Sequence, residues 1–311
     1  MNESAERLIR NIASVIYGKR EAIELAVIAL LARGHMLFDD APGVGKTMLA
    51  RALAASVDLR FRRVQFTPDL MPSDITGASV FNPKSGSFDF VPGPVFASIL
   101  LADEINRATP RTQSALLECM SESQVTADGT TWPLPDPFMV IATQNPVESH
   151  GTYRLPEAQL DRFLIRGSIG YPAAEAEVAI LKSQINRSAH PVTSLKPVLS
   201  ADQLGALIAA TEAVHVSDDV LGYIAQIAEA TRSDPRFRLG VSPRGTLALM
   251  RASQARALLD GRDFVEPATV KAMLVPVLAH RVILHPDHEV GERAAERLVA
   301  EVASRVAPPV R

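Results

Sequence analysis

The segment DDAPGVGKT, residues 39–47, contains residue types that could bind the phosphates of a nucleotide. Gly43 and Gly45 allow the backbone to turn its N–H groups inward around an anion. Lys46 supplies a positive charge for the β- and γ-phosphates, and the hydroxyl of Thr47 is suited to ligate magnesium. The helix expected to follow points its positive end at the phosphates. This spacing therefore indicates a phosphate-binding loop.

Two acidic residues stand at the start of this loop. The usual pattern is G-x-x-x-x-G-K-[ST], and Asp40 occupies the position of its first glycine. The groups that contact phosphate lie further along, from Gly43 onward, and all of them are present. We therefore expect Asp39 and Asp40 to point away from the nucleotide, toward the second domain described below or a neighbouring subunit.

Two adjacent carboxylates end the apolar run Ile99–Ala102. If this run is a buried strand beside the phosphate loop, Asp103 is positioned to hold magnesium and its waters. Glu104 is then positioned to polarise the water that attacks the γ-phosphate. The alternative interpretation is an acidic junction between a strand and a loop. The phosphate loop favours the first interpretation, because nucleotide hydrolysis requires both parts.

A third segment, Val140–Thr143, is also apolar and ends in the amides Gln144 and Asn145. Asn145 could orient the attacking water or the γ-phosphate between the first two segments. Taken alone, it would be interpreted as a turn residue before Pro146. Its predicted role therefore depends on the phosphate loop and the carboxylates.

The elements that must position these residues alternate between strands and helices. Such alternation predicts an α/β fold, a parallel sheet covered by helices on both faces, with nucleotide at the carboxyl ends of the strands. The sequence predicts buried strands at 35–38, 61–66, 98–102, 138–142 and 164–169, and helices at 4–16, 21–33, 47–57 and 109–122.

From residue 173 the sequence pattern changes and becomes helical almost throughout. We therefore expect a nucleotide-binding domain at residues 1–172, followed by a small all-helical domain at residues 173–311. The helices of the second domain are predicted at 173–185, 201–213, 217–232, 242–260 and 266–279.

Composition and charge restrict the class of protein. Of the 311 residues, 47% are hydrophobic and 22% are charged, as in a globular protein. The net charge of −3 gives no basic excess of the kind that favours nucleic-acid binding. The single cysteine, Cys119, excludes an internal disulfide, and its helical context indicates a core thiol. We expect a cytoplasmic protein, because the N-terminus lacks the apolar core of a signal peptide and the longest apolar run, Leu25–Ala32, cannot span a bilayer.

Five motifs together resemble the AAA+ ATPases, and within them the MoxR family. They are APGVGKT, LLADEINRA, VIATQNP, LPEAQLDRFL and VSPRG, in the order that the family shows. The resemblance runs from about Ile16 to about Leu284. It implies an αβα nucleotide-binding domain with a helical lid. It also implies a ring, usually a hexamer, with ATP and Mg²⁺ between neighbouring subunits.

The resemblance also implies which residues contact ATP. In the segment Ile16–Gly18, Ile16 and Gly18 correspond to residues that pack on the adenine, although simple core packing of Ile16 is equally consistent with its type. Magnesium is assigned to Thr47 and Asp103. The phosphate contacts are assigned to Pro42, Gly43, Val44, Gly45, Lys46, Thr47 and Met48.

Two arginines correspond to catalytic residues of the family. Arg162 matches the arginine finger that reaches the γ-phosphate of the next subunit, and such a residue is worth roughly 10³- to 10⁵-fold in rate. Arg107 and Arg154 are alternatives for this role, and a surface salt bridge is the non-catalytic interpretation. Arg244 matches the lid arginine called sensor 2. A cation in the first turn of a helix is unfavourable, which favours another role for it, on its own ATP or on a neighbour's.

Two hairpins are predicted beside the sheet. The segment Thr67–Phe96 lies where many AAA+ proteins have one continuous helix, and its residues 81–88 predict a hairpin turning at NPKSG. It resembles the helix-2 insert, which faces the central pore of the ring. A second hairpin is predicted at Val125–Leu134. The only tryptophan, Trp132, lies on it and either packs under the hairpin or contacts a partner.

The resemblance implies a chaperone-like ATPase that remodels, activates or matures partner proteins. Family members act with a separate protein that carries a von Willebrand factor A domain and with a client enzyme. Two alternatives are a nucleic-acid motor and the motor subunit of a magnesium-chelatase-like complex. The hairpins offer little for nucleic acid, because a single cation, Lys84, stands against Asp69, Asp74, Asp89 and Asp128.

A group of metal-ligating residue types lies near the C-terminus. His280, His285, Asp287 and His288 could together suggest a metal site. These residues straddle a helix end and Pro286 without a known ligand pattern, and the resemblance includes His280 in the lid. We therefore expect no metal there.

Overall fold

A five-stranded parallel sheet forms the centre of the N-terminal part of the chain, in the order β2-β5-β8-β1-β9. The computed structural model describes residues 2–145, 152–185, 191–288, 291 and 293–309. The strands are β1 (Met36–Asp39), β2 (Phe61–Gln65), β5 (Ile99–Asp103), β8 (Met139–Gln144) and β9 (Ile165–Gly167).

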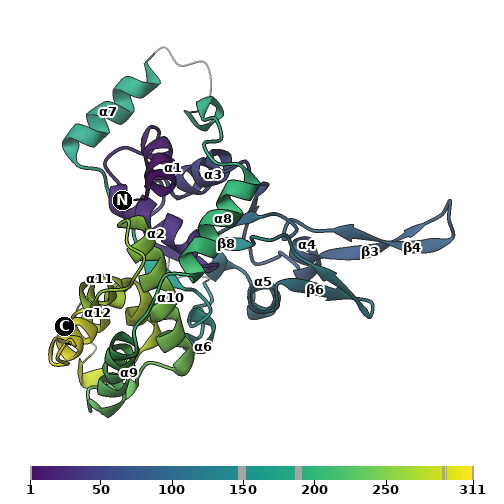
Figure 1. Cartoon of the computed structure of the whole chain (residues 1–311). Helices are drawn as coiled ribbons and strands as arrows, with labels where there is room; N and C mark the ends of the chain where they lie inside the picture. Colours follow the sequence, from purple (N-terminus) through teal and green to yellow (C-terminus); the bar gives the residue numbers. More distant parts are fainter. Residues whose placement is uncertain (1, 146–151, 186–190, 289–290, 292, 310–311) are drawn as a thin grey trace.

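The sheet is buried because both of its faces are apolar. Successive residues of a strand point to opposite faces. Leu101 and Ile141 accordingly belong to one apolar core, whereas Leu100 and Val140 belong to the other. Helices on both faces cover these cores, so the predicted αβα fold class is confirmed (Figure 1). The covering helices include α1 (Glu3–Ala13), α2 (Arg20–Leu31), α3 (Lys46–Ser56) and α5 (Pro110–Glu122).

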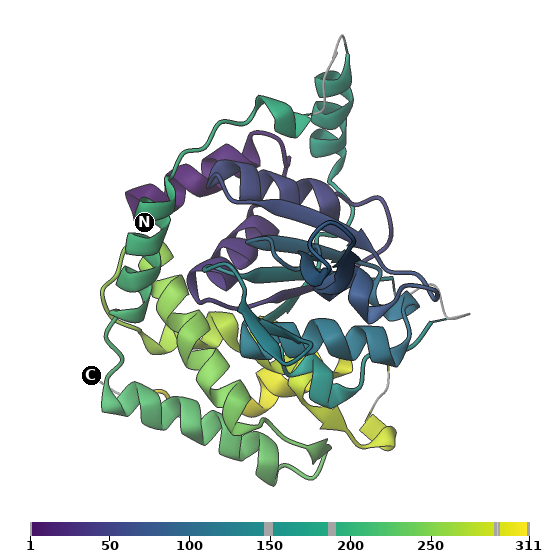
Figure 2. The same ribbon diagram turned by 90° about the vertical axis from the view of Figure 1, so that its right-hand side faces the viewer.

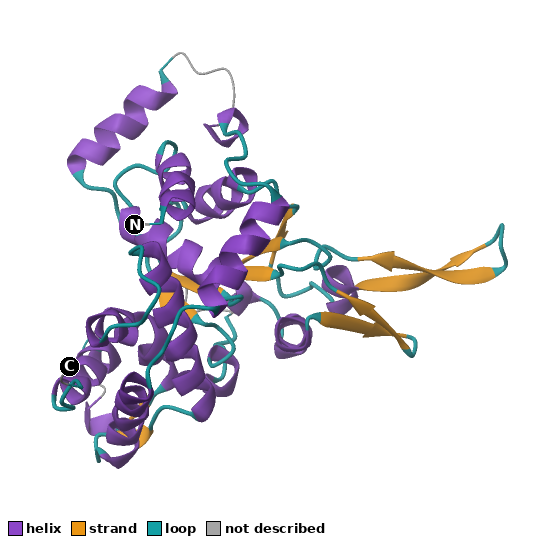
Figure 3. Cartoon of the chain, in the orientation of Figure 1, coloured by secondary structure: helices purple, strands orange, loops and turns teal. Residues whose placement is uncertain are grey.

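Two hairpins project from the body of the molecule, as predicted (Figure 3). Trp132 stacks on Phe90 of the other hairpin with ring centroids 5.0 Å apart, and it remains 38% exposed. The tryptophan therefore packs between the hairpins rather than within one of them. The strands are β3 (Gly77–Asn82) with β4 (Ser87–Pro92), and β6 (Gln124–Ala127) with β7 (Thr130–Pro133); the short helix α4 (Pro72–Thr76) precedes β3.

The C-terminal part of the chain is mainly helical, which confirms the predicted helical lid. Two features were not predicted, namely the last helix and a small ladder between β10 and β11. The division of the chain at residue 172 stays a prediction. The short helix α6 (Glu157–Leu160) precedes β9. The elements of the C-terminal part are α7 (Ala174–Gln184), α8 (Ala201–Glu212), α9 (Asp218–Ser233), β10 (Phe237–Leu239), α10 (Pro243–Leu259), α11 (Pro267–Leu278), β11 (Ile283–Leu284) and α12 (Ala294–Ser304). Short 3-10 turns occupy Ile105–Arg107, Pro191–Ser194, Ala279–Arg281 and Pro286–His288.

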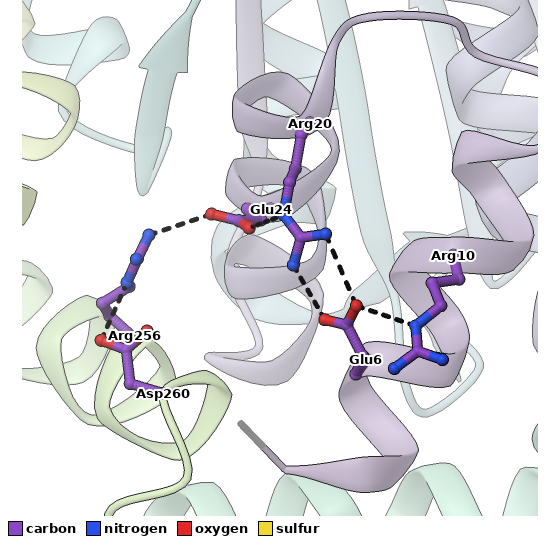
Figure 4. Close-up of polar contacts among 6 residues, drawn as sticks. All are labelled: Glu6, Arg10, Arg20, Glu24, Arg256 and Asp260. Carbon is purple, nitrogen blue, oxygen red and sulfur yellow. Dashed lines mark hydrogen bonds and ion pairs between the residues drawn. The ribbon is translucent and has the colours of Figure 1, made fainter.

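Ion pairs connect the first two helices to α10 (Figure 4). Arg20 contacts Glu6 of α1 and Glu24 of its own helix, both at 2.8 Å, and Arg256 of α10 contacts Glu24 at 3.1 Å. Hydrogen bonds from Arg20 lower the pKa of Glu6. Exposed pairs contribute little to stability individually, so this network mainly fixes the relative orientation of the helices. Among the described residues, no helix has the length and apolar character needed to cross a membrane.

A buried histidine precedes β1 and makes stability sensitive to pH. His35 Nε2 donates to the Met120 carbonyl and its Nδ1 accepts from the Val140 N–H, both at 3.0 Å. Both bonds require the neutral ring, and burial lowers the pKa of His35 to about 4. The ordinary pKa of histidine in an unfolded chain is about 6.5. The contribution of His35 to the free energy of unfolding is therefore fully present above pH 6.5 and is lost as the pH falls from 6.5 toward 4.

We expect the free energy of unfolding to fall by about 1.4 kcal/mol per pH unit for this group across that window. Urea unfolding at several pH values measures the slope. His280 contributes in the same direction, because burial lowers its pKa to about 3. His35→Asn, whose amide retains an acceptor for Val140, should reduce the slope, whereas His215→Asn on the surface should not. An unchanged slope in His35→Asn would contradict this account.

Candidate nucleotide-binding site

A cavity of about 370 Å³ opens at the carboxyl ends of the parallel strands. This is the edge of the sheet at which ligands bind in such folds. It brings together most of the residues that the sequence predicts for nucleotide. The lining residues are Pro42, Gly43, Gly45, Lys46, Thr47, Met48, Arg51, Arg63, Gln65, Asp103, Glu104 and Asn145.

The loop between β1 and α3 has the backbone geometry of an anion cradle. Gly43 and Gly45 have φ angles of 86° and 103°, which L-residues rarely adopt, and α3 begins at the next residue. A Cβ atom at either glycine would meet no atom within 4 Å, so the space before the loop is open. Lys46 Nζ donates to the carbonyls of Asp40 (2.7 Å) and Ala41 (3.1 Å). Burial lowers the pKa of Lys46, and the nearby carboxylates oppose this effect.

The two acidic residues at the start of the loop face β9. The carboxylate of Asp40 accepts hydrogen bonds from the backbone N–H groups of Ile169 (2.5 Å) and Gly170 (3.0 Å). Asp39 forms an ion pair with Arg166 on β9. Asp40 is buried, and its two backbone bonds explain the carboxylate at a position usually held by glycine. It joins the loop to the segment that follows β9.

Replacing Asp40 tests this structural role. We expect Asp40→Ala to lower the free energy of unfolding by about 1–3 kcal/mol, because the buried N–H of Ile169 and the partly buried N–H of Gly170 lose their acceptor. Nucleotide affinity, measured by calorimetry, should stay within about threefold of the wild type, because the Asp40 carboxylate is held by Ile169 and Gly170 and does not line the nucleotide cavity. Asp40→Asn retains one acceptor and should be intermediate in stability. Nucleotide binding that tightens tenfold in Asp40→Ala would show that the carboxylate opposes the phosphates.

The carboxylate at the end of β5 is held from two sides. Asp103 Oδ2 accepts from Arg63 Nη2 at 2.7 Å and from Arg63 Nε at 3.1 Å. Its Oδ1 accepts from the hydroxyl of Thr143 on β8 at 2.6 Å. Asp103 is buried but lines the same cavity as Thr47. These two oxygen groups are of the kind that magnesium prefers.

Glu104 has a strained backbone and a side chain held in the cavity. Its φ of 56° is in the left-handed region, and its N–H donates to the Thr143 hydroxyl at 2.8 Å. Its Oε2 accepts from Gln65 Nε2 at 2.6 Å and from Arg107 Nη1 at 3.0 Å. Asn145, at the end of β8, is buried and lines the same cavity. The structure thus places the carboxylates and the amide around the mouth of the phosphate loop.

Sequence reasoning missed four residues of this site, namely Arg51, Arg63, Gln65 and Thr143. Arg63 and Gln65 lie two apart on β2, so they share a face of the strand. In the strand FRRVQ, the alternation of polar residues was a usable signal. It could not be interpreted from sequence, because β2 pairs with β5 and the strand order is not the order of the chain.

Three predicted nucleotide residues do not line this cavity. Ile16 is buried in the core, and Val44 is half-buried against that core. Gly18 has a φ of 69°, and a Cβ atom there would lie 2.9 Å from Ala176 of α7. The predicted adenine contact at Ile16 and Gly18 therefore stays a prediction.

A second cavity, of about 250 Å³, contains both Arg162 and Arg244. The Arg162 guanidinium donates to the hydroxyl of Ser121 at 2.6 Å and to the carbonyl of Leu117, both on α5. Neither arginine lines the cavity of the phosphate loop. Three further arginines and one carboxylate line the second cavity, namely Arg33, Arg251, Arg281 and Asp161.

The alternative finger residues lie elsewhere. Arg107 pairs with Glu104 of its own chain at 3.0 Å. Arg154 is exposed on the segment before α6 and lines neither of the two cavities. His280 is buried with its Nε2 2.9 Å from the Phe163 carbonyl. Within the described ranges, no three His, Cys, Asp or Glu side chains form a group suited to a metal ion.

Two family models match parts of this chain. Residues 35–165 match the model of the ATPase family associated with various cellular activities (AAA). Residues 229–302 match the model of the AAA lid domain. The first match includes the phosphate loop, both carboxylates and the buried amide.

Individual relatives match along nearly the whole chain. Chaperone MoxR1 of Mycobacterium tuberculosis is 40% identical over 98% of this chain and 82% of its own length. Uncharacterized protein YeaC of Bacillus subtilis is 49% identical, over 98% of this chain and 94% of its own. Protein MoxR of Methylorubrum extorquens is 34% identical, over 92% of this chain and 90% of its own length. The crystal structure of a presumed ATPase from Cytophaga hutchinsonii has a TM-score of 0.91 and 34% identity, over 99% of this chain and 95% of that one.

Proposed function

Because this chain belongs to the MoxR family of AAA+ ATPases, we propose that it hydrolyses ATP to remodel, activate or mature partner proteins. The observation that carries this proposal is the first cavity. It joins the phosphate loop, Asp103, Glu104 and Asn145 at one edge of the sheet. A loop that binds phosphate, a magnesium site and a water-activating carboxylate are the parts that phosphoryl transfer to water requires.

The residues present fit ATP and magnesium. The glycine loop is open in front, and Lys46 has one ammonium hydrogen beyond the two that its bonds to Asp40 and Ala41 use. Thr47 and Asp103 would hold Mg²⁺, which when bound neutralises charge on the phosphates. Arg63 and Thr143 keep the Asp103 carboxylate in a fixed orientation.

Glu104 is the group that orients and deprotonates the attacking water in this proposal. Gln65 and Arg107 hold its carboxylate, and the backbone at Glu104 is fixed through Thr143. The ion pair with Arg107 fixes the position of the Glu104 carboxylate, which accepts the proton of the water in this proposal. Asn145 is positioned to hold the water or the γ-phosphate from the side of β8.

The arginine finger and sensor 2 act on the ATP of a neighbouring subunit in this proposal. Arg162 and Arg244 share a cavity that is separate from their own phosphate loop. That cavity contains five arginines, of which Arg281 pairs with Asp161, and Arg33 with Asp136 and Glu212. The remaining excess of positive charge favours an anionic ligand. A hexameric ring, which membership of the family implies, would place each phosphate loop against the arginines of the next subunit.

The hairpins are the proposed contact with partner proteins. Phe81 and Phe88 pair across β3 and β4 at 5.4 Å, yet they are 53% and 70% exposed. Exposed aromatic pairs of this kind mark interaction surfaces. One relative is named a chaperone. In this proposal the protein acts in the cytoplasm. Its partners there are a separate protein with a von Willebrand factor A domain and a client enzyme.

Phosphate release by the purified protein tests this function against its alternatives. We expect ATP hydrolysis that requires magnesium and is unaffected by single- or double-stranded DNA. Several-fold stimulation by DNA would favour a nucleic-acid motor instead. Co-purification with the catalytic subunit of a chelatase would favour the magnesium-chelatase alternative. Absence of magnesium-dependent hydrolysis in a protein that assembles would contradict the ATPase assignment.

A further inference from the structure

Helix α7 presents an apolar stripe that no described residue covers. Val178, Leu181 and Ile185 are 48%, 64% and 69% exposed. Their spacing of three and four residues places them on one face of the helix. None of the α7 side chains that the structure describes is buried. Figures 1 and 2 show α7 at the opposite end of the molecule from α9.

The lid contains an apolar groove of about 420 Å³ between α9 and α10. Leu221 of α9 and Leu247 of α10 line it and are 39% and 43% exposed. Ala225 and Ala228 of α9 and Met250 of α10 line it as well. The small side chains of Ala225 and Ala228 allow the backbone of another helix to approach closely, so the groove is shaped to receive a helix.

The stripe and the groove match in spacing. The three apolar residues of α7 follow one another at steps of three and then four residues. On α9, Ala228, Ala225 and Leu221 have the same steps in the opposite chain direction. In an antiparallel arrangement each large side chain meets a partner, and Glu175 comes beside Arg232 at the end of the groove. The pairs are Val178 with Ala228, Leu181 with Ala225, and Ile185 with Leu221.

The apolar stripe and the groove do not meet within one subunit, because they lie at opposite ends of the molecule (Figure 1). We propose that α7 of one subunit docks into the groove between α9 and α10 of the next. This is a head-to-tail contact, which closes into a ring when its rotation permits. The inference rests on the proposed function in that it requires the subunits to assemble.

The proposed contact is continuous with the shared ATP site. Leu247 lines both the groove and the cavity that contains Arg162 and Arg244. On the other subunit, Ala176 of α7 lies against Gly18, in the segment predicted to contact adenine. A neighbour that presents its ATP to Arg244 would therefore present its α7 to the adjoining groove. The contact makes the position of the lid depend on the position of the neighbouring nucleotide site.

Disulfide cross-linking tests this contact directly. Leu181→Cys and Ala225→Cys are made on separate chains, mixed with ATP and magnesium, and oxidised. The native Cys119 is buried, and burial raises its pKa to about 12, so it contributes little background. We expect a disulfide-linked dimer in the mixture and not in either variant alone, because the bond needs Cα atoms about 4–7 Å apart. Leu239→Cys, which is also exposed but lies outside the groove, replaces Ala225→Cys in the control pair.

A second variant measures the energetic contribution. Leu181→Asp should weaken assembly about tenfold or more, since an exposed leucine that becomes buried is replaced by a charge. Leu239→Asp should leave assembly unchanged. If the wild type assembles and the Leu181–Ala225 pair cross-links no better than the control pair, the α7 contact is wrong and the ring stands. If the wild type does not assemble with ATP, the ring and the contact are both wrong.

Discussion

Glu104→Gln should bind ATP with near-normal affinity and hydrolyse it about 10²- to 10⁴-fold more slowly than the wild type, the range for loss of a general base. The amide keeps the size of the side chain and can still accept from Gln65 or Arg107. It cannot take a proton from water. Calorimetry measures the affinity, and single-turnover phosphate release measures the chemical step.

Glu118→Gln is the matched control for this experiment. Glu118 lies on the exposed face of α5 and undergoes the same chemical change, so its hydrolysis rate should equal that of the wild type. Near-normal hydrolysis in Glu104→Gln would remove Glu104 from its role. A loss of ATP binding in this variant would instead show that the carboxylate is needed to shape the site.

Arg162→Ala should leave ATP binding intact and lower hydrolysis by roughly 10³- to 10⁵-fold, the range for loss of an arginine finger. In this structure the side chain is held on α5 through Leu117 and Ser121, outside its own nucleotide cavity. A small fraction of the variant mixed with excess wild type should lower activity more than in proportion, because each variant subunit impairs a neighbour's site.

Arg111→Ala is the control, because Arg111 is an exposed arginine on α5, the helix that the Arg162 side chain contacts. It should neither slow hydrolysis nor inhibit the wild type in mixtures. Activity that falls in simple proportion to the Arg162→Ala fraction would contradict a shared site. Arg107 would then be the next candidate, since its guanidinium already contacts Glu104.

Local sequence was enough to predict those parts of the site that lie on one segment. Gly43, Gly45, Lys46 and Thr47 follow one another, and the strand before them and the helix after them are short-range patterns. The position of Asp103 at the end of a buried strand is equally local. The strands and most helices were predicted for the same reason. Helix α12 carries apolar residues at helical spacing, so the signal was present and was overlooked.

What the sequence could not predict depends on contacts between distant segments. Asp40 finds its partners at Ile169 and Gly170, which lie beyond the other four strands of the central sheet. Arg63 reaches Asp103 only because β2 is placed next to β5 in the sheet. The cavity that unites Arg162 with Arg244 depends on how the lid packs on the first domain. Strand order and domain packing set these contacts, and neither follows from periodicity.

The most direct test of a shared ATP site is complementation between two inactive variants. Lys46→Ala lacks the lysine of the phosphate loop but keeps Arg162, whereas Arg162→Ala keeps a complete phosphate loop. Neither should hydrolyse ATP alone. Mixed in equal amounts, they should recover activity at about one shared site in four, where an intact loop meets an intact arginine of the next subunit. If the mixture assembles into the same particles as the wild type and remains inactive, ATP is not shared between subunits in the way proposed here.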